Sequence, residues 1–181
     1  MDSKCKICRR AGVKLFLKGE RCFSPKCSMV RRPYAPGQKG KRRPRALSEY
    51  GKELREKQKL RNWYNLRERQ FKKYVKEILS QKQRKEDATA LLIRKFENRL
   101  DNVIFRLGFA PSREQARQLI SHRHFNVNGR LVNVPSFGVK KGDVIAVSDK
   151  SRKKVIFQNL ANSLKKHKFP SWLKLNVEEF K

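Results

Sequence analysis

Four cysteines near the start of the chain are the residues whose type and spacing could most directly do chemistry. They form two close pairs, Cys5 with Cys8 and Cys22 with Cys27, separated by 13 residues. Two such pairs can present four thiolates tetrahedrally to one ion, and a closed four-sulfur shell is typical of structural zinc. A basic segment of about 30 residues buries too little apolar surface to fold alone, and metal binding supplies folding free energy. We therefore predict an N-terminal four-cysteine knuckle with one zinc ion per chain.

Other readings of the cysteines stay open at this point. An iron–sulfur cluster uses the same four ligands, and the residues could also be free thiols or two disulfides. Zinc is favoured over the cluster because no redox partner residues are evident. A catalytic cysteine is not expected, because no second residue set forms a matching dyad. His122 and His124 form a lone H-x-H pair without nearby acids, so contact with phosphate or a 2′-hydroxyl is the better hypothesis for His122.

The charge of the whole chain points to a polyanionic partner. The 181 residues include 47 Lys and Arg but 16 Asp and Glu, which gives a net charge of +31, and 38% of the residues are apolar. This charge repels itself without a partner, and nucleic acid is the commonest polyanion. No apolar run approaches a membrane span and the N-terminus is polar. We expect one or two compact domains, no export, no membrane partner and no small-molecule substrate.

The cysteines lead into a basic arm and then into helices. Residues 21–48 contain no acid, and the sequence RRPYAPGQKGKRRPR suits neither helix nor strand. We expect this arm to be extended or disordered when free and to order along a phosphate backbone. Residues 48–85 show an apolar stripe at helical spacing, with Ser48 as N-cap, a break at RNWYN, and a linker over 80–88.

Residues 88–147 predict a small module of two helices and short strands. The first helix ends at Gly108, and Ser112 with Gln115 forms a capping box that opens the second. Asn128-Gly129 predicts a tight hairpin, and Val144 to Val147 a buried strand. Further on, we expect a helix in the second half of residues 151–168 and a strand over 172–177.

A basic ledge is expected where the second helix of this module meets the hairpin. Its candidate contact residues are Arg99, Ser112, Arg113, Arg117, Ser121, His122, Arg123, Asn126, Asn128 and Arg130. Acids are too few to neutralise it, although Asp101 could pair internally with an arginine. Phe and Tyr mostly fall on apolar faces, so we expect no aromatic stacking platform, and recognition by shape and phosphate geometry favours folded RNA. An RNA-modifying enzyme or a zinc-dependent DNA-binding regulator fits less well, because no catalytic domain is evident and the charge is spread over both halves.

The sequence RLDNVIFRLGFAPSREQARQLISHRHFNVNGRLVNVPSF resembles the RNA-binding module of small-subunit ribosomal protein four. Residues 15–19, the turn at 36–40, SEYGKELREKQKLR and RERQFKKY resemble the same family, so the similarity spans nearly the whole chain. The resemblance implies an α+β fold in which a mostly helical domain holds an inserted α/β module. The implied boundaries are 1–46 for the knuckle and arm, 47–88 for helices, 89–163 for the module, and 164–181 for a return to the first domain.

The resemblance also implies a role. Members of the family are structural proteins, not enzymes: they bind small-subunit rRNA at a multi-helix junction of its 5′ domain and nucleate assembly of the subunit body. They contact ribosomal protein five, line the mRNA entry path and affect translational accuracy, in ribosomes of the cytoplasm. Relatives usually continue past the position of Lys181 with a stretch that helps to contact protein five.

The resemblance assigns residues as well. The cysteines match the zinc-carrying bacterial form, and Arg42, Arg43 and Arg45 match arginines that face the message. The further RNA contacts implied outside the module are Arg9, Arg10, Lys14, Arg31, Arg32, Tyr34, Gln38, Lys39, Lys52, Arg55 and Arg69.

Overall fold

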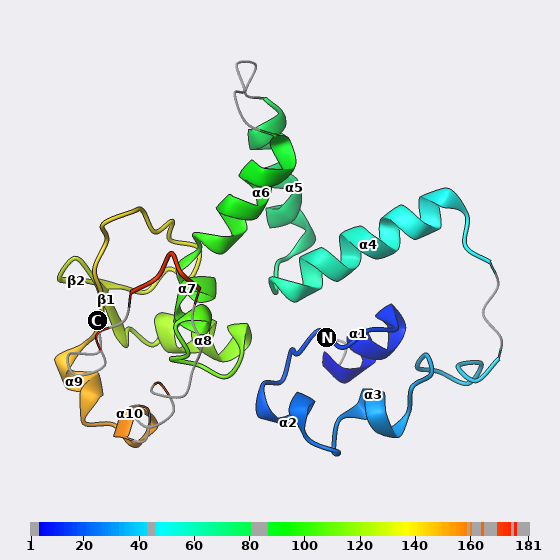
Figure 1. Ribbon diagram of the computed structural model, residues 1–181, viewed down its shortest axis with the longest axis horizontal. Coiled ribbons are helices and arrows are strands. Elements are labelled where there is room, and N and C mark those ends of the chain that lie inside the picture. The colour runs from blue at the N-terminus through cyan, green and yellow to red at the C-terminus, as the bar shows by residue number, and fades with distance from the viewer. Residues whose placement is uncertain are drawn as a thin grey trace. The chain divides into compact units, whose positions relative to one another are not determined.

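The computed structural model describes residues 4–42, 46–80, 87–158, 160, 164, 170–174 and 176 (Figure 1). The chain divides into two compact units, residues 1–76 and 77–181, and each is described by itself. None of the helices in the described ranges is both long and apolar enough to cross a bilayer.

The first unit begins with three short helices around the cysteines: α1 (Lys4–Ala11), α2 (Glu20–Phe23) and α3 (Ser28–Arg31), with α1 packed against α3. Among the described residues up to position 42, the buried apolar side chains are Leu15 and three of the four cysteines. The cysteines therefore take the place of a hydrophobic core in this part of the chain.

Two longer helices complete the first unit and extend to its boundary. In α4 (Glu49–Trp63) the Ser48 hydroxyl accepts a hydrogen bond from the backbone N–H of Gly51 at 3.2 Å, which confirms the predicted N-cap. The predicted break at RNWYN is also confirmed, because α4 ends there and four residues separate it from α5 (Glu68–Leu79). Glu68 accepts hydrogen bonds from Lys57 and Arg61 of α4 at 2.9 and 3.1 Å. The Lys57 hydrogen bond is the main cause that lowers the pKa of Glu68.

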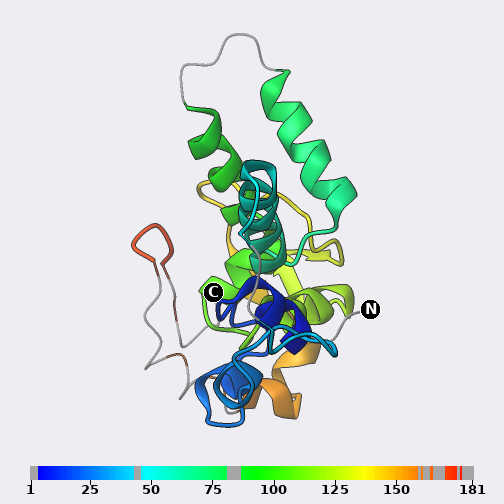
Figure 2. The ribbon, with the colours of Figure 1, turned by 90° about the vertical axis from the view of Figure 1, so that its right-hand side faces the viewer.

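The second unit is built on three helices, α6 (Ala88–Glu97), α7 (Leu100–Arg106) and α8 (Arg113–Ser121). Lys95 of α6 forms an ion pair with Glu77, and α7 packs against α8 (Figures 1 and 2). Gly108 follows α7 with φ 84°, as expected for a C-terminal glycine. The Ser112 hydroxyl accepts from the Gln115 N–H at 3.3 Å and caps α8.

A three-stranded antiparallel sheet covers the helices of this unit. Its order is β2-β1-β3, formed by β1 (Phe125–Val127), β2 (Arg130–Val132) and β3 (Ile145–Val147). Asn128 and Gly129 have φ of 50° and 77°, which confirms the predicted tight hairpin between β1 and β2. The sheet buries one face against the helices, and the core consists of Leu100, Val103, Ile104, Leu107, Phe109, Ala110, Ala116, Leu119, Ile120, Phe125, Val127, Ile145, Val147, Phe157 and Leu164.

The C-terminal part differs from the sequence prediction. The structure has α9 (Asp149–Arg152) and α10 (Val155–Gln158), whereas most of the predicted helix in the second half of 151–168 lies outside the described residues. The predicted strand at 172–177 is wrong for its described residues, because Leu173 donates its N–H to Pro170 in a turn instead of a ladder. Leu164 and Leu173 pack on the core of the second unit. The predicted domain boundaries, including the return of 164–181 to the first domain, stay predictions.

Candidate nucleic-acid interface

The four cysteines line one small cavity of about 20 Å³ in the first unit. This volume suits a single water-sized occupant. The backbone N–H of Lys18 donates to the Cys22 sulfur at 3.4 Å. Burial raises the pKa of the Cys8 thiol, and the other three cysteines raise it further. The four cysteines are therefore gathered around one cavity.

The four cysteines supply sulfur ligands for a metal ion, but their side chains are not arranged as a coordination shell. All four cysteines are free thiols, so the structure contains no disulfide between them. Across the described residues, no three Cys, His, Asp or Glu side chains are arranged so that they could hold a metal ion. The donor chemistry, four soft sulfurs around one ion-sized cavity, nevertheless fits a soft cation such as zinc.

The basic arm is held against the cysteine segment by Arg9. The Arg9 guanidinium donates to the carbonyl oxygens of Tyr34 and Ala35 at 2.9 and 3.3 Å and lies 4.9 Å from the centre of the Tyr34 ring. The Lys41 ammonium lies 5.6 Å from the same ring. A Cβ on Gly40 would overlap the Ala35 carbonyl oxygen, so only glycine fits this turn. Up to residue 42 the arm is thus a set of anchored turns rather than the extended segment that the sequence predicted.

Most RNA-contact candidates of the first unit lie on its surface. The exposed ones are Arg10, Lys14, Arg31, Arg32, Gln38, Lys39, Lys52, Arg55 and Arg69, while Arg9 and Tyr34 are half-buried. Lys52 forms a surface ion pair with Glu49 at 2.6 Å. Of the three candidates for the mRNA path, Arg42 is exposed, whereas Arg43 and Arg45 lie outside the described residues.

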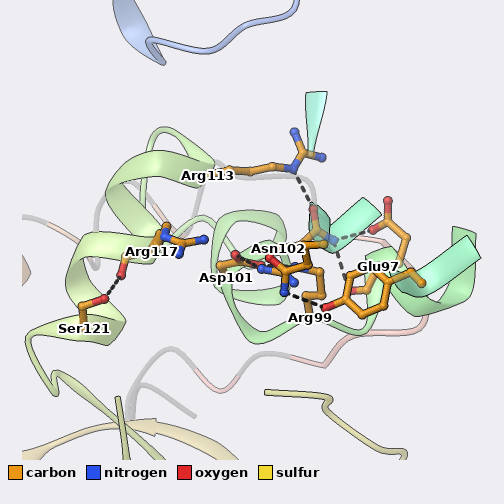
Figure 3. Close-up of polar contacts among 9 residues, drawn as sticks. Glu97, Arg99, Asp101, Asn102, Arg113, Arg117 and Ser121 are labelled. Carbon is orange, nitrogen blue, oxygen red and sulfur yellow. Dashed lines mark hydrogen bonds and ion pairs between the residues drawn. The ribbon is translucent and has the colours of Figure 1, made fainter. Parts of the chain in front are cut away.

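α8 and the hairpin that follows it carry the exposed and half-buried basic candidates of the second unit. Arg117 and Ser121 lie one turn apart on α8 (Figure 3), and the Ser121 hydroxyl donates to the Arg117 carbonyl at 3.0 Å. We call this the α8–hairpin surface; it consists of Arg117, Ser121, His122, Arg123, Asn126, Asn128 and Arg130, all exposed or half-buried. Between residues 112 and 132 the sequence has one acid, Glu114. The predicted ledge therefore has a net positive surface that can face phosphates.

Three other candidates of the second unit are buried, and the exposed Asn128 side chain is hydrogen-bonded to Asp143 and Val144. Arg99 is 2% exposed and forms two hydrogen bonds with Asp101, at 3.0 and 2.6 Å, which confirms the predicted internal pairing of Asp101. Arg113 is 8% exposed and donates to Asn102 at 2.8 Å. Ser112 is buried as the cap of α8. Contact of Arg99 with RNA would require its ion pair to open.

A polar network beneath α8 was not foreseen from the sequence. Glu97 accepts two hydrogen bonds from Arg106, at 3.1 and 2.8 Å, and one from the Asn102 amide at 2.7 Å. The same Asn102 side chain accepts from Arg113 (Figure 3), whose guanidinium lies 4.5 Å from the centre of the Phe105 ring. The network connects the end of α6 with α7 and the first turn of α8, and thereby fixes the helix that presents Arg117.

A basic helix and hairpin on a small α+β core, joined to a basic cysteine-containing unit, define an RNA-binding protein. Residues 1–96 match the family model of the ribosomal protein S4/S9 N-terminal domain, and residues 98–145 match the S4 domain. The small ribosomal subunit protein uS4 of Thermus thermophilus is 51% identical over 177 residues, 98% of this chain and 83% of the relative. The uS4 proteins of Kosmotoga olearia and Syntrophus aciditrophicus are 49% and 48% identical, over 96% and 99% of this chain and 82% and 85% of theirs.

The chain belongs to the uS4 family of small-subunit ribosomal proteins. This confirms the family resemblance seen in the sequence. It makes the chain a structural, rRNA-binding component of the small subunit and not an enzyme.

Proposed function

We propose that the chain binds a multi-helix junction in the 5′ domain of small-subunit rRNA and nucleates assembly of the subunit body in the cytoplasm. The observation that carries this proposal is the α8–hairpin surface, a cationic face on the core of the second unit, where Glu114 is the single acid of residues 112–132 and Asp143 accepts a hydrogen bond from Asn128. The polar network beneath α8 restricts the motion of this helix before RNA binds. Less conformational entropy is then lost on binding. A junction of helices offers phosphates at fixed spacing, which suits a preorganised surface better than a flexible strand does.

Charge reversal at Arg117 tests the proposal. We expect Arg117→Glu to weaken binding to a 5′-domain rRNA fragment at least about tenfold and to reduce the slope of log K against log salt by about one. Arg94→Glu, on the exposed side of α6 in the same unit, is the matched control and should change affinity much less. Equal effects of the two variants, or unchanged binding of Arg117→Glu, would remove the α8–hairpin surface from the interface.

The cysteine cavity supports a second part of the proposal, a structural zinc ion held by Cys5, Cys8, Cys22 and Cys27. When bound, the ion would supply folding free energy to a segment whose buried apolar side chains are few. Elemental analysis of the purified chain should find one zinc per chain, and iron would indicate the cluster instead. Cys27→Ser should lose the metal and increase amide exchange over residues 4–42 without affecting the second unit. Met29→Leu, which also changes a residue lining the cavity, should retain the metal.

The arm supports a third part, in which Arg42, Arg43 and Arg45 face mRNA near its entry into the subunit and affect translational accuracy. The supporting observation is that Arg42 is exposed where the described, anchored part of the arm ends. Alanine at the three arginines should leave subunit assembly intact while altering mRNA binding and decoding fidelity. Failed assembly would show that they hold rRNA. Contact with ribosomal protein five belongs to the same proposal, and crosslinking in assembled subunits tests it.

A further inference from the structure

An exposed aromatic pair lies within the cysteine-containing segment of the first unit. The rings of Phe16 and Phe23 are stacked, with centroids 5.0 Å apart and planes inclined by 28°. Phe16 is 41% exposed and Phe23 77%. This pair is therefore an exception to the prediction that aromatic residues fall on apolar faces. Most of the Phe23 ring is exposed to solvent although it stacks on Phe16.

The backbone holds Phe16 in an unusual conformation. Its φ is 51°, in the left-handed region, which is a genuine outlier for a bulky side chain. The neighbouring Leu15 is buried at 7% exposure, so the chain turns Leu15 inward and Phe16 outward within two residues. Such a conformation persists only where the surrounding structure imposes it, and it often marks a functional position.

Charge around the pair indicates what it binds. Four exposed cations, Lys14, Lys18, Arg21 and Lys26, flank the two rings in sequence, against one acid, Glu20. Protein interfaces are depleted in lysine, whereas sites for unpaired nucleotides combine cations for the backbone with aromatic faces for the bases. We propose that Phe16 and Phe23 form a stacking platform for an unpaired base of the small-subunit rRNA. This inference rests on the proposed rRNA-binding function and adds a single-stranded contact to recognition by shape.

Substitutions at Phe23 separate base stacking from apolar protein contact. The full chain, with zinc present throughout, is titrated with the 5′-domain rRNA. Stacking predicts that Phe23→Ala and Phe23→Leu both weaken binding, by about 5- to 150-fold, because a leucine has no aromatic face. Phe23→Tyr should bind like the parent chain. The salt dependence should stay unchanged, unlike that of a lysine variant, because no charge is lost.

The matched control is Tyr50→Ala, which removes a 73% exposed ring from α4 of the same unit, where Glu49 and Glu53 stand nearby in sequence. It should leave affinity unchanged. Unaltered amide exchange over residues 4–42 in each Phe23 variant establishes that the segment is still folded. If exchange rises, a photoreactive phenylalanine analogue at position 23 replaces the truncations, and a crosslink to rRNA is the result expected.

Four results would overturn the inference. If the parent chain binds the rRNA and Phe23→Ala binds equally well, the platform is refuted while the proposed function stands. If Phe23→Leu retains full affinity, or the analogue crosslinks to a protein in assembled subunits, the pair is an apolar docking site for a protein. If the parent chain does not bind the rRNA, both the inference and the proposed function fail.

Discussion

Replacing Asp101 by asparagine tests whether the buried ion pair with Arg99 holds the second unit together. Arg99 and Asp101 are 2% and 5% exposed, and their closest atoms are 2.6 Å apart. The substitution keeps the shape of the side chain but leaves the guanidinium buried without this carboxylate, which typically costs about 3–5 kcal/mol. This is a large part of the roughly 5–15 kcal/mol that stabilises a domain. For a unit of this size we expect a melting temperature lower by at least about 10 °C.

The measurement is thermal and urea unfolding of the full chain followed by circular dichroism, with amide exchange to locate the change. Asp149→Asn is the matched control, because it removes a carboxylate that is 92% exposed and 3.6 Å from Arg152. It should cost no more than about 0.5 kcal/mol. The double variant Arg99→Met with Asp101→Leu should recover most of the loss, since apolar side chains of similar volume often replace a buried pair without cost.

Two results would contradict this reasoning. If Asp101→Asn costs no more than Asp149→Asn, the short buried pair contributes nothing beyond a surface pair. If the double variant is as unstable as the single one, the loss comes from packing and not from an uncompensated charge.

Two further predictions concern pH and backbone geometry. Burial, and then the charges of Lys154 and His122, lower the pKa of His124; the unfolded chain therefore binds protons more readily, and the free energy of unfolding should fall as the pH drops below about 6.5. His124→Gln should remove this dependence in urea titrations at several pH values. His122→Gln, at an exposed position, should retain most of it, because burial is the main cause that lowers the pKa of His124. Gly40→Ala should open its turn and raise local amide exchange at least about tenfold, while Gly138→Ala, where a Cβ meets no atom within 4 Å, should change exchange little.

Local signals in the sequence were sufficient for the starts of α4 and α8 and for the hairpin, although α1 to α3 and the break between α6 and α7 were not predicted. Ser48 and Ser112 cap the helices that they were expected to cap. Asn128-Gly129 forms the expected turn, because few other residue pairs tolerate two successive positive φ values. In each case the governing interaction spans only a few residues, so it is visible in the order of the residues alone.

Interactions between distant segments were not predictable in the same way. Arg99 and Arg117 look alike in the sequence, yet one is buried against a carboxylate and the other lies on the surface. The Glu97–Asn102–Arg113 network depends on three helices meeting, and no spacing rule encodes that. The same holds for Phe16, whose outward orientation depends on a backbone angle that no residue pattern indicated.

The hairpin turn has a consequence for the chemical ageing of the protein. Asn-Gly is the dipeptide most prone to deamidation, because the unhindered glycine nitrogen can attack the asparagine amide. In the folded chain the Asn128 amide is held at both ends, since its nitrogen donates to Asp143 at 2.9 Å and its oxygen accepts from the Val144 N–H at 2.8 Å. Folding should therefore slow the attack of the Gly129 nitrogen on the Asn128 amide. Conversion of Asn128 to aspartate would place a second carboxylate next to Asp143. The repulsion between the two carboxylates would loosen the turn whose hydrogen bonds slow deamidation.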